Sequence, residues 1–452
     1  MTSLENPGPR AFVGTRLSVM MFLQFFIWGA WYVTVGNYMK AHGMFDEVKW
    51  AYTVGPIAAI ISPFFLGMIA DRFFATERVL GVMHILGGVA MFCAPLAAGA
   101  GPTVFIIVLL LHMLFYMPTL GLTNTLAFHH ITNQEKQFPI IRVFGTIGWI
   151  VANWVVSKGF HADFEATQFY VTGVACLLLG VFSFTLPHTP PPAAGQKVRI
   201  SEILGLDALR RLSSFSFLVF LISSFLICIP LAAYYAYAPV YAGKVGFEDP
   251  AFNMSFGQIA EIFFMVAMPW FFAWLGVKWM LLVGMLAWVA RYGLFAAADS
   301  NHILWMVFLG ILLHGICYDF FFVTGFIYTD KKCTKEIRGQ AQGLLVLVTQ
   351  GLGLGLGAQI MGRIMAAYTP PDAKALQAQA AELSKQAFET TGEAAKTLSD
   401  QAAELGAQAT AMIDWQTAWL IPCIAAAVIM ALFFILFKND SGAGEEAPPV
   451  EG

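Results

Sequence analysis

The chain has 452 residues, of which 58% are hydrophobic and only 12% are charged, and its mean hydropathy is +0.69. Such a composition excludes an ordinary soluble globular protein. A net charge of −3 gives no indication of nucleic-acid binding, and the six cysteines contain no CxxC pair. We therefore expect no metal site, no cofactor and no nucleic-acid partner.

The hydrophobic residues are gathered in blocks of about 20, the length that crosses the hydrocarbon core of a bilayer. Twelve such blocks predict an all-α membrane protein with twelve transmembrane helices. The first block is longer than the apolar core of a signal peptide and no clear cleavage site follows it, so we expect it to remain in the protein. The blocks cover residues 17–39, 51–70, 79–98, 103–127, 143–160, 168–187, 214–240, 255–275, 278–298, 303–328, 340–366 and 415–437.

The basic residues between the blocks predict the orientation of the helices. If the amino terminus is in the cytoplasm, sixteen lysine and arginine residues lie in cytoplasmic segments and only four lie in outer loops. Both termini are therefore expected in the cytoplasm.

The blocks form two sets of six, separated by a basic linker that contains prolines. We predict an N-terminal six-helix half at 1–190, a cytoplasmic linker at 191–213 and a C-terminal six-helix half at 214–440, followed by a disordered tail at 441–452. Two such halves resemble the major facilitator fold, in which the substrate binds near the middle of the membrane.

Residues 369–414 interrupt this plan, because the segment is rich in Ala, Gln and Glu and is too polar to cross a bilayer. The segment predicts an external insertion made of one amphipathic helix, or of two helices that bend near Gly392. A flexible or lipid-surface decoration and a partner-binding segment are both open as roles.

The loop after the second block reads "GMIADRFFATERVL". Its Gly67-x-x-x-Asp71-Arg72 pattern, followed by Arg78, resembles the cytoplasmic loop signature of the major facilitator superfamily. The resemblance implies that these four residues form a conformational latch between helix ends in one transport state. The alternative is an ordinary turn with basic flanks on the cytoplasmic side.

Asp319 lies within the nearly unbroken apolar run "ILLHGICYDFFFVTGFIY". A central aspartate costs about 2.5–3.5 kcal/mol on membrane-insertion scales, so such residues usually face a water-filled cavity and often carry protons. The alternative is a structural acid paired with a base such as Arg291.

Two other blocks carry polar residues on one helix face. Gln258 and Glu261 are spaced i, i+3 in the eighth block, and Arg142, Thr146 and Trp149 are spaced i, i+4, i+7 in the fifth. A guanidinium, a hydroxyl and an indole on one stripe suit a planar ligand that is rich in oxygen. For the pair in the eighth block, an interhelical hydrogen bond that serves only packing is the alternative.

Seven segments, in order, resemble the bacterial nucleoside–proton symporters of the major facilitator superfamily. The segments are "FLQFFIWGAWYVTVGNYM", "YMPTLGLTNT", "FPIIRVFGTIGWI", "LGLDAL", "QIAEIFF", "YDFFFVTG" and "DWQTAWL". This resemblance implies that Asp319, and with it Glu261, couples transport to protons. The residues that it places around the substrate are Arg142, Thr146, Trp149, Gln258, Glu261, Tyr318 and Asp319.

The chain departs from the family pattern at four positions. Leu231 and Tyr234 stand in the seventh block where the family has polar amides, and His314 replaces an aromatic residue. Trp149 stands where a phenylalanine is usual. The missing amides remove hydrogen bonds that a ribose or a base would use.

The resemblance implies a proton-coupled nucleoside symporter that imports by alternating access and is not an enzyme. We expect a monomer surrounded by lipid in the bacterial cytoplasmic (inner) membrane. The departures in the seventh block leave another small polar metabolite, such as a sugar or a nucleobase, open as the cargo. A non-transporting membrane sensor is a third hypothesis, for which the external insertion is the one suggestive feature.

Overall fold

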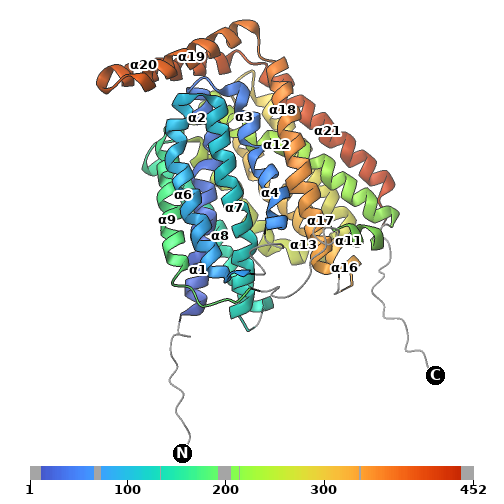
Figure 1. The fold of residues 1–452 in the computed structure, drawn as a ribbon. Coiled ribbons are helices and arrows are strands. Elements are labelled where there is room, and N and C mark those ends of the chain that lie inside the picture. Colours follow the sequence, from blue (N-terminus) through green and yellow to red (C-terminus); the bar gives the residue numbers. More distant parts are fainter. Residues whose placement is uncertain are drawn as a thin grey trace, which may run out of the picture. The chain divides into compact units, whose positions relative to one another are not determined.

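The structure is a computed structural model that describes residues 12–65, 73–132, 134–191, 205–212, 214–334 and 337–438. Within these ranges the secondary structure is helical and contains no strands, as the apolar blocks predict (Figure 1). The helices up to the predicted linker are α1 (Val13–Tyr32), α2 (Val35–Ala41), η1 (Phe45–Glu47), α3 (Val48–Ala51), α4 (Val54–Phe65), α6 (Thr76–Ala100), α7 (Pro102–His130), α8 (Gln134–Trp154), η3 (Val155–Gly159) and α9 (Thr167–Ser183). The later helices are α11 (Leu206–Arg211), α12 (Phe215–Val245), α13 (Pro250–Ala298), α14 (Leu304–Leu312), α15 (His314–Tyr318), η4 (Asp319–Val323), α16 (Thr324–Lys332), α17 (Arg338–Val346), η5 (Leu347–Gly353), α18 (Leu354–Ala367), α19 (Pro371–Glu389), α20 (Gly392–Ala411) and α21 (Trp415–Leu436).

Within the described residues, each of the twelve apolar blocks lies mainly on helix. By length and hydropathy, nine of the described helical stretches are long enough to cross a membrane. Three features account for the difference. The eighth and ninth blocks form one 49-residue stretch, α13, which is interrupted at Gly276 with φ 66°. Helix α9 has only 17 residues, and residues 66–70 of the second block lie outside the described residues.

The described residues pack into two compact units. Unit 1 comprises residues within 1–197, 249–255 and 374–410, and unit 2 comprises residues within 198–248, 256–373 and 411–452. The units are defined by contacts, so they differ from the predicted halves, which are continuous stretches of the chain. Most of the predicted linker, residues 192–204, lies outside the described residues, and the predicted boundaries stay predictions.

In unit 1, α1 packs against α8 and α9, and α6 packs against α7 and α9. The approach of α1 and α8 depends on Gly148, because a Cβ atom there would lie 2.1 Å from the carbonyl oxygen of Phe22. No side chain fits in that space, so the two backbones meet. This contact holds the stripe of Arg142, Thr146 and Trp149 beside α1.

In unit 2, α12 packs against α18 and α21, and the first part of α13 crosses α15 closely. A Cβ atom at Gly315 would lie 2.5 Å from the carbonyl carbon of Ala260, and one at Gly257 would lie 3.0 Å from Cβ of His314. These two glycines therefore let α13 and α15 touch by their backbones. The crossing lies beside Glu261 and four residues before Asp319.

The polar insertion forms a hairpin of two helices, α19 and α20, which separate at Gly392 with φ 72°. Its residues 374–410 belong to unit 1, where they lie across the end of the bundle that contains α2 (Figure 1). Contact is close, since Cβ atoms at Gly43 and Gly406 would meet the backbone nitrogen of Ala381 and the carbonyl oxygen of Lys40. The sequence left one helix or two open, and the structure has two.

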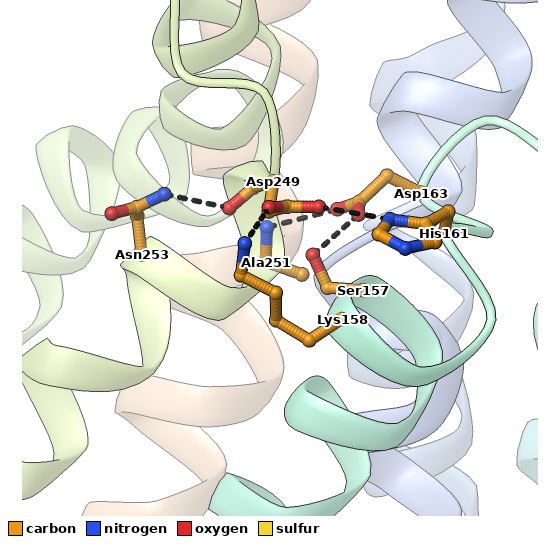
Figure 2. A network of polar contacts seen from close by, with 7 residues as sticks. All are labelled: Ser157, Lys158, His161, Asp163, Asp249, Ala251 and Asn253. Carbon is orange, nitrogen blue, oxygen red and sulfur yellow. Dashed lines mark hydrogen bonds and ion pairs between the residues drawn. The ribbon is translucent and has the colours of Figure 1, made fainter.

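A second segment, residues 249–255, joins unit 1 through a polar network at the end of η3 (Figure 2). Nζ of Lys158 forms an ion pair with Asp249. The carboxylate of Asp163 accepts hydrogen bonds from the hydroxyl of Ser157 and from the backbone nitrogen of Ala251, the latter at 2.9 Å. The first turn of α13 is thereby fixed to the end of the fifth apolar block.

Candidate transport site

The stripe predicted on the fifth block lies on α8, and its three side chains are all partly exposed within unit 1. The guanidinium carbon of Arg142 lies 4.1 Å from the centroid of the Phe25 ring on α1, which is a cation–π contact. This contact holds Arg142 against α1. The structure thus brings Arg142, Thr146 and Trp149 together on one side of one helix.

Trp149 belongs to an aromatic cluster with α1. Its ring lies 5.5 Å from that of Trp28 and 6.1 Å from that of Tyr32, both in edge-to-face arrangement. The indole nitrogens of Trp28 and Trp149 are buried without a hydrogen-bond partner among the described residues. Two indole donors that lack acceptors can bind an oxygen-bearing ligand. The sequence analysis did not single out Tyr32, although its i, i+4 spacing from Trp28 is the signal that would have identified it.

Next to this cluster, Gln24 uses both ends of its amide side chain in structural hydrogen bonds. Its amide nitrogen donates to Thr119 at 2.7 Å, and its amide oxygen lies 2.8 Å from Nε2 of His84. The hydroxyl of Tyr116 donates to the backbone carbonyl of Gln24 at 2.6 Å. Gln24 therefore joins α1, α6 and α7 and supports the aromatic cluster from behind.

In unit 2, Asp319 begins a π-helical turn, η4, in the middle of the tenth apolar block. Single π-helical turns within α-helices often occur at functional sites. The side chain is 0% exposed, and neither carboxylate oxygen has a hydrogen-bond partner among the described residues. The sequence also allowed Asp319 to be a structural acid paired with Arg291. No ion pair joins these two described residues.

Glu261 is the acidic neighbour of Asp319, and the two carboxyl groups interact electrostatically. Gln258, Glu261 and Tyr318 are partly exposed within unit 2, whereas Asp319 is buried beside them. The structure therefore gathers the four predicted residues of this half around the crossing of α13 with α15. An apolar site of this kind, with a few convergent polar groups, suits a small polar ligand.

Three residues near this crossing form one stack that sequence reasoning did not assemble. The guanidinium carbon of Arg291 lies 3.9 Å from the ring centroid of Tyr234. The Tyr234 ring stacks on His314 with centroids 5.1 Å apart and an interplanar angle of 17°. Tyr234 and His314 are two of the departures from the family pattern, so these departures lie in contact with each other.

The predicted latch is only partly described. Gly67, Asp71 and Arg72 lie outside the described residues, and Arg78 is an exposed residue in the first turn of α6. The latch therefore stays a prediction.

Within the described ranges, no group of three or more His, Cys, Asp or Glu side chains could hold a metal ion.

Comparison with known proteins identifies a family of transporters. The sequence model of the family described as "Nucleoside H+ symporter" matches residues 12–442. YegT of Escherichia coli strain K12 is 44% identical over 362 residues, which are 77% of this chain and 84% of YegT. The nucleoside permease NupG of the same strain is 29% identical over 441 residues, or 94% of this chain and 95% of NupG. The xanthosine permease of that strain is 29% identical over 443 residues, or 94% of this chain and 96% of the permease.

Solved structures of transporters share the fold of this chain. The crystal structure of nucleoside transporter NupG superposes with a TM-score of 0.78 at 27% identity, covering 95% of this chain and all of that chain. A bacterial homologue of the lysosomal transporter Spinster superposes with a TM-score of 0.66 at 14% identity, covering 96% of this chain and all of that chain. The second likeness concerns the fold alone. The chain therefore has the fold of the major facilitator transporters.

Proposed function

The chain belongs to the family of nucleoside–proton symporters, and from this premise we propose that it imports a nucleoside together with protons by alternating access. Membership in a transporter family favours this function over the sensor hypothesis. The residues that we assign to nucleoside binding are Arg142, Thr146, Trp149, Gln258, Glu261, Tyr318 and Asp319.

The observation that carries this proposal is the environment of Asp319. A charged carboxylate that is buried without a partner is costly, and a second carboxylate nearby adds to the cost. Release of a proton from Asp319 therefore has to coincide with the entry of water or with the arrival of a partner. Because alternating access supplies such a change in each cycle, Asp319 couples proton movement to transport, and Glu261 assists it.

The remaining features complete the proposal. The protein lies in the bacterial cytoplasmic membrane with both termini inside and works as a monomer surrounded by lipid. The excess of basic residues in the predicted cytoplasmic segments supports this orientation. Gly67, Asp71, Arg72 and Arg78 form the latch that closes one transport state.

A second candidate cargo is a different small polar metabolite, such as a sugar or a nucleobase. Leu231 and Tyr234 favour it, because both are buried in α12 at the positions where the family pattern has amides. A site without those amides binds a ribose differently or binds another molecule. The transport mechanism is the same for either cargo.

Uptake of labelled uridine and adenosine into cells that lack their own nucleoside uptake tests the proposal, with and without a protonophore. We expect accumulation that collapses when the proton gradient is removed. If cells that carry the protein in their membrane take up neither nucleoside, nucleosides are excluded as the cargo and the second candidate is favoured. Uptake that the protonophore leaves unchanged would exclude proton coupling.

A further inference from the structure

Arg291 is a buried cation without a counter-charge. Its side chain is 0% exposed, and no ion pair joins it to a carboxylate within the described part of the chain. Its Nε donates to the carbonyl of Gly310 at 3.0 Å, and its side chain also interacts with the hydroxyl of Tyr292, although neither Nη1 nor Nη2 has a partner that meets full hydrogen-bond geometry. A guanidinium stays charged in proteins and can only donate hydrogen bonds. Arg291 therefore makes its surroundings electropositive.

The groups around the guanidinium supply no negative charge to balance it. Tyr234, Tyr235, Tyr292 and Cys317 are its electrostatic neighbours. Tyr292 donates its hydroxyl to the carbonyl of Pro230 and so offers no proton to a ligand. The face of Tyr234 is the group that the cation covers directly.

The stack extends from Arg291 toward the predicted substrate residues. Tyr234 lies between the guanidinium and the imidazole of His314, and the His314 ring lies 5.7 Å from that of Tyr318. Tyr318 is partly exposed and directly precedes Asp319. The hydroxyl of Tyr234 would lie 3.3 Å from a Cβ atom at Gly257, the residue before Gln258. The stack thus ends where the predicted site begins.

Two further polar atoms of the stack lack partners. The hydroxyl of Tyr234 and Nδ1 of His314 are both buried without a hydrogen bond among the described residues. Nearly all buried polar groups in proteins are paired with protein or water, so these two atoms are available to pair with a ligand that reaches them. A cation against the ring face draws electron density from Tyr234, which makes its hydroxyl a better donor and a weaker acceptor.

This arrangement differs in kind from the amides that it replaces. An amide side chain both donates and accepts hydrogen bonds, so it can pair with a carbonyl or with an amino group. A hydroxyl in an electropositive setting favours a carbonyl oxygen and disfavours an amino group. The site should therefore prefer a carbonyl oxygen to an amino group in every ligand that it binds.

On the basis of the proposed function, we infer that Arg291, Tyr234 and His314 are the specificity-determining element of the site in unit 2. The element selects nucleosides whose base presents a carbonyl oxygen over those that present an amino group at the same place. Tyr234 and His314 contact the base. Arg291 is a positioning residue that acts through Tyr234.

Two matched pairs of competitors test this inference. Uridine and cytidine, and inosine and adenosine, each exchange a carbonyl for an amino group, and the adjacent ring nitrogen changes with it from a hydrogen-bond donor to an acceptor. Competition against labelled uridine uptake is measured for each. We expect the carbonyl member of each pair to compete about tenfold better, because the gain or loss of one hydrogen bond changes affinity by about that factor. Equal competition within both pairs, together with active uridine uptake, overturns the inference and leaves the proposed function intact.

Variants then assign the selectivity to the stack. In Arg291→Gln, and independently in Tyr234→Phe, which loses only the hydroxyl, we expect the ratio within each pair to fall to about twofold or less. Arg291→Lys, which keeps the charge, should retain part of the ratio. Arg363→Gln, at an exposed arginine of α18, is the matched control and should keep the full ratio.

Membrane abundance is measured for each variant, so that a misfolded Arg291→Gln is recognised and the Tyr234→Phe result decides. If the stack had a purely structural role, the variants would weaken competition by all four nucleosides together, and the ratio within each pair would not change. A folded Tyr234→Phe protein with an unchanged ratio overturns the inference. Absence of any nucleoside uptake by the unaltered protein removes the proposed function and this inference with it.

Discussion

Nζ of Lys158 lies 2.5 Å from Oδ2 of Asp249, so an ion pair joins the end of η3 to the residue that precedes α13 (Figure 2). The Lys158 side chain is 51% exposed, and an ion pair that is open to water contributes little stability by itself. The stronger part of this junction is the buried carboxyl of Asp163, which binds the backbone nitrogen of Ala251. The first turn of α13 is therefore held mainly by a group that can titrate.

Stability should depend on pH through Asp163. Burial raises the pKa of this carboxyl to about 6, against the opposing effect of hydrogen bonds from Ser157 and Ala251. Because the pKa is higher in the folded state, the contribution of Asp163 is fully present below its ordinary value near 3.8 and is lost as the pH rises through about 6. Relative to Asp163→Asn, the unaltered protein should lose about 2 kcal/mol between pH 4 and pH 7.5.

Thermal unfolding of both proteins in detergent at a series of pH values measures this difference. The neighbouring titratable groups, His161 and Asp249, are present in both proteins, so their effects largely cancel. A difference in melting temperature that stays constant from pH 4 to pH 7.5 would show that Asp163 does not titrate in this range.

Replacement of the buried acid should separate binding from accumulation. Asp319→Asn keeps the shape of the side chain but cannot exchange a proton. We expect this variant to bind nucleoside and to exchange it across the membrane, while accumulation against a gradient is lost. Counterflow and net uptake, measured in the same vesicles, distinguish the two activities.

Asp400→Asn, at an exposed position of α20, is the matched control and should accumulate nucleoside normally. Protonophore-sensitive accumulation by Asp319→Asn would remove Asp319 from the coupling mechanism and leave Glu261 as the remaining candidate.

Features that depend only on residues close together in the sequence could be predicted from it. The apolar blocks coincide with helices, because the length and hydropathy of each block are local properties. The stripe of Arg142, Thr146 and Trp149 follows from helical periodicity alone. Gly392 begins the second helix of the insertion, and its positive φ suits glycine.

Features that depend on contacts between distant residues could not be predicted. The hydrogen bond from Ala251 to Asp163 joins positions 88 residues apart, and no local pattern indicates that residues 249–255 pack with unit 1. The sequence shows Tyr234 and His314 as two separate departures from the family pattern, but their stacking on Arg291 depends on how α12, α13 and α15 meet. The sequence suggested Arg291 as a partner for Asp319, whereas the structure places it against Tyr234.

The indole of Trp149 should contribute to substrate affinity more than to the transport rate. Stacking of a base on an aromatic side chain contributes about 1–3 kcal/mol. Trp149→Ala should therefore raise KM for uridine about tenfold with a smaller change in the maximal rate, and Trp149→Phe should retain most of the affinity. Trp305→Ala, at an exposed tryptophan of α14, is the control. An unchanged KM in Trp149→Ala would place the base elsewhere.

Attachment of the hairpin to unit 1 should depend on Gly43. Its φ is 71°, and a Cβ atom there would lie 2.3 Å from the backbone nitrogen of Ala381 in α19. Gly43→Ala therefore combines a strained backbone conformation with a clash against backbone that cannot easily move. We expect a loss of about 2–4 kcal/mol, from about 1–2 kcal/mol for the positive φ and a similar amount for the overlap.

Gly392 provides the matched control, because its φ of 72° is nearly the same and nothing lies within 4 Å of the position of its Cβ atom. Gly392→Ala should show the cost of the backbone conformation alone, about 1–2 kcal/mol. Thermal unfolding and limited proteolysis of the hairpin compare the two variants. A larger loss of stability and faster cleavage in Gly43→Ala would show that the contact with Ala381 holds the hairpin, whereas equal effects would mean that α19 shifts to accept the extra atom at little cost.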